Sequence, residues 1–155
     1  MTSTSIFTPE GMYRFAGKLA VPCLVSAAIV ALIAFYLGFF VAPVDVTQGN
    51  SYRILYIHVA SAWMAMLLYV LMAIFCILGL VTEKKLWPMI AASLAPTGAL
   101  MAFLALWTGS LWGRPTWGAY WVWDARLTSA LILFFFYLGY LALQNAIPDW
   151  RSCLL

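Results

Sequence analysis

The stretch that decides the fold is ILYIHVASAWMAMLLYVLMAIFCILGLV, residues 54–81, which contains no Asp, Glu, Lys or Arg over 28 positions. About 20 consecutive apolar residues are enough to cross the hydrocarbon core of a bilayer. Within that core each backbone N–H and C=O must bond inside its own segment, so an apolar run of this length is helical. The stretch therefore predicts a transmembrane helix.

Three further apolar runs of similar length accompany it, at residues 19–42, about 88–111 and 127–146. The first is longer than the roughly 7–15-residue core of a cleaved signal peptide, which indicates a permanent span. Together the four runs predict an all-α fold, a polytopic bundle of four transmembrane helices in the lipid bilayer. No repeat or linker divides the chain, so we expect one membrane domain over residues 1–155.

The third run carries its own packing signals. Pro96 lies inside the run and predicts a kink. Ala91, Ala95 and Ala99 recur at every fourth position and form a stripe of small residues that suits close helix packing.

The composition supports a membrane protein and excludes other classes. Hydrophobic residues make up 66% of the 155 residues, and charged residues only 8%. A soluble domain could not hide so much apolar surface. The net charge of +3 is too small and too scattered to predict nucleic-acid binding. Cys23, Cys76 and Cys153 form no CxxC pair, so neither a disulfide framework nor a thiolate metal site is expected.

The positive charges of the loops predict the orientation. Cytoplasmic loops of membrane proteins carry an excess of Lys and Arg. Five basic residues lie on the side of the two termini, and three lie on the other side: Arg14, Lys18, Lys84, Lys85 and Arg151, against Arg53, Arg114 and Arg126. The balance places both termini in the cytoplasm and the loops at 43–53 and 112–126 outside.

The outer loop 112–126, WGRPTWGAYWVWDAR, contains four of the eight tryptophans of the chain. Gly113 and Pro115 predict a turn at its start. A short amphipathic helix is expected to follow on the outer face. One face of this helix would combine residues at spacings of three, four and seven positions: Trp117, Tyr120, Trp121 and Asp124.

This tryptophan-rich loop allows two interpretations. Tryptophan and tyrosine often mark the boundary between membrane and water, as an aromatic belt. Alternatively, the rings form a platform for a flat apolar ligand with charged edges, for which Arg114 and Arg126 supply nearby cations. Asp124 precedes the fourth run and fits the position of a helix N-cap, which leaves room for a second role in pairing with an arginine.

His58 is the only histidine of the chain, and it lies four residues into the second run. At 1.5 Å per residue this is about 6 Å below the outer end of the helix. An ionisable group at membrane depth is a candidate functional residue, although a packed histidine with one hydrogen bond is the alternative. An imidazole beside indole rings at one membrane face matches what an iron porphyrin needs, since it requires an axial nitrogen and flat walls.

Several segments together resemble a known family. Residues 112–129 resemble the tryptophan-rich WWD signature of haem-handling membrane proteins, and residues 48–59, QGNSYRILYIHV, resemble the start of the second span in the heme exporter protein C (CcmC) branch. Ala95-Pro96 and the segment TGSLWG at 108–113 fit the same family. The resemblance covers about residues 12–145.

The resemblance implies a haem carrier without catalysis of its own, in the cell inner membrane. Such a protein binds haem b transiently on the periplasmic face during c-type cytochrome maturation. It delivers haem to the haem chaperone CcmE, together with the transporter subunits CcmA and CcmB and the small partner CcmD. The implicated residues are His58 as ligand of the iron, and Trp112, Arg114, Trp117, Tyr120, Trp121, Trp123, Asp124 and Arg126 around the haem.

The chain also departs from the family pattern. Family members have six spans and a second axial histidine in a later outer loop, whereas this sequence shows four spans and one histidine. The resemblance therefore predicts a chain truncated after four spans. Two other classes stay open: a structural membrane subunit without stable haem, and a cytochrome b-like electron-transfer subunit, which would need an oligomer to supply two histidines.

Overall fold

A computed structural model of the chain describes residues 6–146. These residues form two compact units, divided between Pro43 and Val44, and each unit is described by itself. Helices α1 to α4 each contain a stretch long and apolar enough to cross a membrane. The protein is therefore a multi-pass membrane protein built from helices, as the four apolar runs predict.

The first unit consists of α1 (Pro9–Tyr36), which continues into a π-helical turn at Leu37–Val41. The helix begins ten residues before the apolar run, because local signals at its N-terminus are strong. The Thr8 hydroxyl accepts a hydrogen bond from the Gly11 N–H at 3.2 Å, and Pro9 occupies the first turn. The polar residues that precede the apolar run are thus the first turns of the helix.

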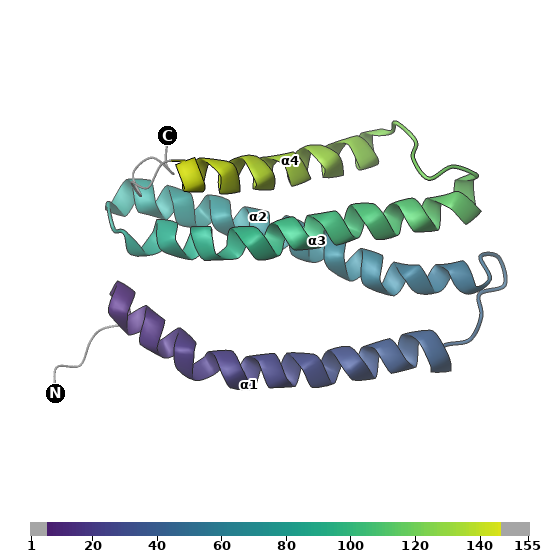
Figure 1. The fold of residues 1–155 in the computed structure, drawn as a ribbon, viewed down its shortest axis with the longest axis horizontal. Coiled ribbons are helices and arrows are strands. Elements are labelled where there is room, and N and C mark those ends of the chain that lie inside the picture. Colours follow the sequence, from purple (N-terminus) through teal and green to yellow (C-terminus); the bar gives the residue numbers. More distant parts are fainter. Residues whose placement is uncertain (1–5, 147–155) are drawn as a thin grey trace. The chain divides into compact units, whose positions relative to one another are not determined.

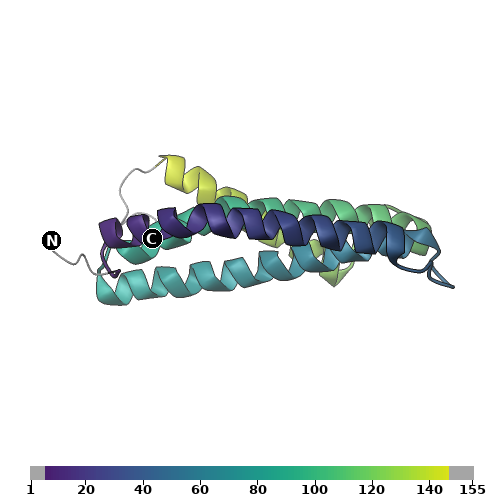
Figure 2. The ribbon, with the colours of Figure 1, turned by 90° about the horizontal axis from the view of Figure 1, so that it is seen from below.

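The second unit contains a 3-10 turn (Asn50–Arg53) and three helices, α2 (Ile54–Thr82), α3 (Leu86–Trp117) and α4 (Ala125–Ala146). Helix α2 packs against α3 and crosses it in the view of Figure 1, and α4 also packs against α3 (Figures 1 and 2). The loop before α2 and the segment between α3 and α4 lie at the same end of the unit (Figure 1). We call this end, formed by residues 44–53 and 118–124, the loop end.

Small residues of α3 allow the helices to approach closely. Ala91 and Ala95 are completely buried and Ala99 is nearly so, which confirms the packing role predicted for this stripe. They belong to a core that also includes Ala65 and Met72 of α2.

Tyr137 of α4 ties the three helices together. Its side chain is fully buried, and its hydroxyl donates a hydrogen bond of 2.7 Å to the backbone oxygen of Ala65 on α2. The ring lies directly over Gly98 of α3, where an added Cβ would come within 2.2–2.5 Å of three of its atoms. Only a glycine at this position leaves room for the tyrosine.

The prediction of a short amphipathic helix inside the tryptophan-rich loop is wrong. Helix α3 continues through Gly113 and Pro115 as far as Trp117, and residues 118–124 that follow are not helical. The turn comes instead at Gly118, whose φ of 78° is in the left-handed region and ends the helix. Gly118 N–H donates to Arg114 O at 3.0 Å, and the Thr116 hydroxyl donates to Trp112 O at 2.8 Å.

The predicted aromatic face is lost with that helix. Trp117 is the last residue of α3, whereas Tyr120, Trp121 and Asp124 lie in the irregular segment that follows. Pro115 has no N–H to donate to the backbone oxygen of Leu111, yet α3 continues past it to Trp117. Pro115 therefore indicates that the end of α3 is near, but the helix does not end at the proline.

Candidate functional site

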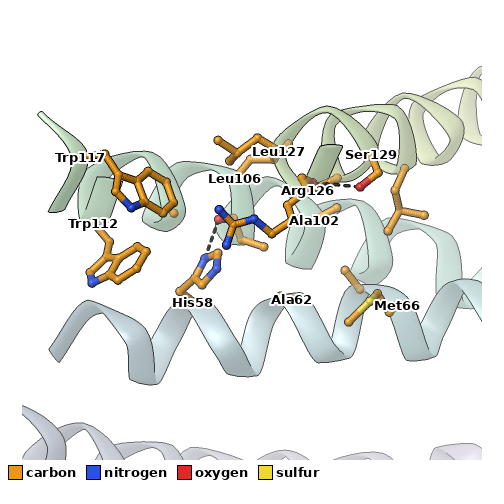
Figure 3. A pocket seen from close by; sticks show the side chains of 15 residues that line it. His58, Ala62, Met66, Ala102, Leu106, Trp112, Trp117, Arg126, Leu127 and Ser129 are labelled. Atoms are coloured by element: carbon orange, nitrogen blue, oxygen red, sulfur yellow. Dashed lines mark hydrogen bonds between the residues drawn. The ribbon is translucent and has the colours of Figure 1, made fainter. Parts of the chain in front are cut away.

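A cavity of about 580 Å³ opens between α2, α3 and the beginning of α4, close to the loop end (Figure 3). Its volume lies in the range of about 300–1,000 Å³ that small-molecule and cofactor sites occupy. One part of its wall consists of small side chains, which keep the space open; these are Ala62, Ala65, Ala102, Ala105, Gly109 and Ala130.

His58 reaches into this region from the second turn of α2. Its Nδ1 lies 2.9 Å from the backbone oxygen of Ala105 on α3 (dashed line at His58 in Figure 3). The hydroxyl of Thr108 lies 3.4 Å from the same nitrogen. A carbonyl oxygen can only accept, so Nδ1 carries the proton. In a neutral imidazole the other nitrogen, Nε2, then keeps its lone pair. The backbone of α3 thus fixes the tautomer that a metal ligand needs.

Gly109 makes this position of the imidazole possible. A Cβ added at Gly109 would lie 2.8 Å from Cε1 and 3.1 Å from Nδ1 of His58. The ring therefore packs directly against the backbone of α3. Any larger residue at this position would push the ring away from its bond to Ala105 O.

Two tryptophans and one arginine complete the wall near the loop end. Trp112 and Trp117 form an edge-to-face pair with ring centroids 5.2 Å apart and an interplanar angle of 79°. The guanidinium carbon of Arg126 lies 5.4 Å from the centroid of the Trp117 ring. Figure 3 shows both indoles and Arg126 on the side of the cavity where His58 lies. The site thus combines an imidazole, two indoles and a cation in an otherwise apolar space.

Asp124 acts as the N-cap of α4. Its Oδ1 accepts a hydrogen bond of 2.8 Å from the Leu127 N–H, and its Oδ2 accepts one of 2.9 Å from Arg126. The bond from Leu127, and next the bond from Arg126, hold the pKa of the Asp124 carboxyl below its usual value. Both roles considered for this residue, the cap and the partner of an arginine, are present together.

The remaining residues implicated by sequence do not line the cavity. Arg114 bonds the backbone oxygen of Gly118, and its guanidinium carbon lies 5.5 Å from the centroid of the Tyr120 ring. Trp121 and Trp123 form a second edge-to-face pair, with centroids 5.5 Å apart. The four tryptophans therefore form two separate edge-to-face pairs rather than one continuous platform.

Of the residues predicted from sequence, four line the cavity: His58, Trp112, Trp117 and Arg126. Sequence reasoning missed the small residues and the apolar side chains of Met66, Leu106, Leu127 and Leu133. A signal for the small residues existed, because Ala102, Ala105 and Gly109 recur at helical spacing in α3.

Residues 6–146 contain no cluster of three or more His, Cys, Asp or Glu side chains that could hold a metal ion. Cys153 and Arg151, which were considered above for a metal site and for orientation, lie outside the described residues.

The comparison with known families shows to which family the chain belongs. The family model for heme exporter protein C (CcmC) matches residues 2–153. The chain belongs to this family. Heme exporter protein C of Escherichia coli (strain K12) is 46% identical over 144 residues, which cover 92% of this chain and 58% of that protein.

Relatives in other organisms support the assignment to this family. Heme exporter protein C of Bradyrhizobium diazoefficiens is 46% identical over 149 residues, covering 96% of the chain and 56% of that protein. A putative cytochrome c biosynthesis ccmC-like mitochondrial protein of Marchantia polymorpha is 50% identical over 120 residues, covering 77% and 53%. The chain thus spans less than two thirds of the length of these relatives.

Proposed function

We propose that the cavity at the loop end binds haem, and that the protein presents haem for the maturation of c-type cytochromes. The observation that carries this proposal is the state of His58. Its Nδ1–H is occupied by Ala105 O at 2.9 Å, so its Nε2 lone pair remains for a metal. Haem is here the cargo of a carrier, and its iron needs a nitrogen of this kind.

The surroundings of His58 suit the rest of a porphyrin. Trp112 and Trp117 offer apolar ring surfaces, and the small side chains of α2 and α3 leave space for a flat molecule. Arg126 lines the cavity and supplies a cation for a carboxylate of the ligand. Because Trp121, Trp123 and Arg114 lie outside the cavity lining, the proposed haem site is smaller than the whole tryptophan-rich loop.

The names of the relatives support the same role. They are described as heme exporters and as proteins of cytochrome c biosynthesis. We infer a carrier of haem b rather than an enzyme, located in the inner membrane with both termini in the cytoplasm, as the five-to-three balance of basic residues indicates. The partners that we propose are the chaperone CcmE, the transporter subunits CcmA and CcmB, and CcmD.

The test is the uptake of haem by detergent-purified protein, followed by its absorption spectrum. We expect the parent chain to bind haem weakly, with one histidine per chain and a spectrum of five-coordinate or mixed iron. The His58→Ala variant should lose binding, and added imidazole should restore it by occupying the vacated space. Trp107→Phe, an exposed ring of α3 outside the cavity, serves as control and should bind as the parent does.

Two outcomes would contradict the proposal. If His58→Ala takes up haem as well as the parent and imidazole changes nothing, His58 is a packed histidine only. If the parent takes up no haem at all, the tryptophans are a membrane belt. A six-coordinate spectrum with two histidine ligands would instead require two copies of the chain at one iron.

A further inference from the structure

A residue outside the cavity fixes the ring of Trp112, which forms part of the cavity wall. The indole Nε1–H of Trp112 donates a hydrogen bond of 3.0 Å to Oε1 of Gln48. The two residues are 64 positions apart in sequence, and both are partly buried. Gln48 belongs to the loop before α2, whereas Trp112 lies in α3. The bond therefore connects the loop before α2 with α3.

Hydrogen bonds within the loop hold the backbone at Gln48. Oδ1 of Asp45 accepts three hydrogen bonds, from the Thr47 N–H at 2.8 Å, the Thr47 hydroxyl at 2.7 Å and the Gln48 N–H at 2.8 Å. The Gly49 N–H closes the turn on the Asp45 backbone oxygen at 3.0 Å, with a φ of 59° at Gly49 that favours glycine. The acceptor for Trp112 is therefore presented by a preformed turn.

This bond decides which edge of the indole borders the cavity. A tryptophan near the membrane needs an acceptor for its N–H, since an unbonded N–H in an apolar space is costly. Gln48 accepts the hydrogen bond of this N–H from the loop side. The ring therefore does not have to point its N–H toward a ligand. The ring then keeps its edge-to-face contact with Trp117 and presents carbon atoms to the cavity.

We propose that Gln48 is a positioning residue of the haem site. It holds the Trp112 ring as an apolar wall and keeps the indole N–H away from the bound molecule. The haem part of this inference rests on the function proposed above, whereas the positioning of the ring does not.

The first measurement uses the full chain without haem. Ultraviolet resonance Raman spectroscopy reports the hydrogen bonding of an indole N–H, and the difference between the parent and Trp112→Phe isolates the Trp112 signal. Gln48→Leu removes the acceptor and should shift the Trp112 signal to that of an unbonded or water-bonded indole. Gln48→Glu keeps an acceptor oxygen and should leave it bonded. Gln144→Leu, at the other glutamine of the chain, should change nothing.

The second measurement is the rate of haem release to an excess of apomyoglobin. Gln48→Leu should accelerate release by about three- to tenfold, the effect expected for one lost hydrogen bond. Gln48→Glu should release haem close to the parent rate. The double variant Gln48→Leu/Trp112→Phe should release haem no faster than Trp112→Phe alone, because both changes remove the same interaction.

Several results would overturn the inference. A Trp112 signal that stays bonded in Gln48→Leu shows that Gln48 does not hold the ring. A lost bond with an unchanged release rate, or fully additive effects in the double variant, shows that the ring position does not matter to the ligand. Failure of the parent to take up haem would overturn the proposed function instead, and the Raman comparison would still decide whether Gln48 positions Trp112.

Discussion

The two halves of the α2–α3–α4 unit use the same kind of residue for opposite purposes. In the half away from the loop end, Gly98 leaves a space that Tyr137 fills completely. In the half near the loop end, Ala102, Ala105 and Gly109 leave a space that stays a cavity of about 580 Å³. Both sets of small residues lie on α3, within about three turns of each other.

The difference between the halves comes from what faces α3. Tyr137 is large, and its hydroxyl finds a backbone partner in Ala65 O, so this part of the interface can close. Opposite Gly109 lies the smaller His58 ring, which packs against the α3 backbone and bonds Ala105 O, and it leaves part of the space open. A stripe of small residues thus permits close packing but does not by itself guarantee it.

The largest effect is expected from Gly98→Ala. The new Cβ would lie 2.2 Å from a ring atom of Tyr137, so the fully buried ring would have to leave its position and strain its bond to Ala65 O. Overpacking of this kind costs about 3 kcal/mol or more of unfolding free energy at the severe end of its range. Thermal unfolding in detergent should show a clear loss, whereas Gly139→Ala, which meets nothing within 4 Å, should unfold like the parent. A stable Gly98→Ala protein would show that the closed half is not tightly packed.

Gly109→Ala should show the difference between the two halves most clearly. Its Cβ would lie 2.8 Å from Cε1 of His58, but that ring borders a cavity and can shift. We therefore expect a small change in stability and a fall in haem affinity of roughly tenfold, equivalent to 1.4 kcal/mol. Titration of the purified variant with haem measures the affinity. Unchanged affinity would mean that the position of the imidazole is not important for binding.

Tyr137→Phe removes only the hydroxyl bond to Ala65 O. Loss of one such bond should cost about 1 kcal/mol of stability, because the ring still fills the space over Gly98. Haem affinity should remain that of the parent, since Tyr137 does not line the cavity. The same unfolding and titration measurements apply. A drop in affinity as large as that of Gly109→Ala would show that the two halves are coupled.

The smallest effect is expected when the pH is lowered. Hydrogen bonds from Thr47 and Gln48 lower the pKa of Asp45, and hydrogen bonds from Leu127 and Arg126 lower that of Asp124, both from 3.8. A lowered pKa means that these bonds stabilise the loop end above pH 3.8, and that this contribution is lost as the pH falls through and below that value. Near-ultraviolet circular dichroism should show a change of the tryptophan signal in this range.

Matched variants identify the groups responsible. Asp45→Asn and Asp124→Asn cannot ionise, so the double variant should lack the acid transition of the tryptophan signal. Persistence of the same transition in the double variant would assign it to another group. The closed half around Tyr137 should keep its own packing throughout, as the Tyr69 and Tyr137 ring contact involves no carboxylate.

Much of the fold could be predicted from the sequence, because lipid imposes a simple rule. Long uncharged runs must be helices, and Ala91 and Ala95 in one of them are buried as expected. The ends of the helices were harder to predict. The first helix begins at Pro9, since an N-cap depends on a local bond of Thr8, and α3 ends at Trp117, just before Gly118, rather than near Gly113.

The site was only partly predictable. His58 stands out as the single histidine, and aromatic side chains stand out by their number. Which of these rings face a common cavity depends on the point where α3 ends, since Trp112 and Trp117 lie on the helix while Trp121 and Trp123 lie beyond it. The bond between Trp112 and Gln48 crosses 64 residues, and no local pattern reveals it.

The ion pair of Arg126 with Asp124 has a kinetic consequence. The Arg126 side chain is largely exposed and already holds a carboxylate at 2.9 Å. A carboxylate on an incoming molecule must compete with Asp124 for Arg126. Its net gain in binding free energy is only the difference between two similar ion pairs, which is small at an exposed site. Charge therefore adds little to the residence time of a ligand, and the rate at which the ligand leaves should depend only weakly on salt. Under the function proposed above, such a limited hold suits a protein that hands its cargo on.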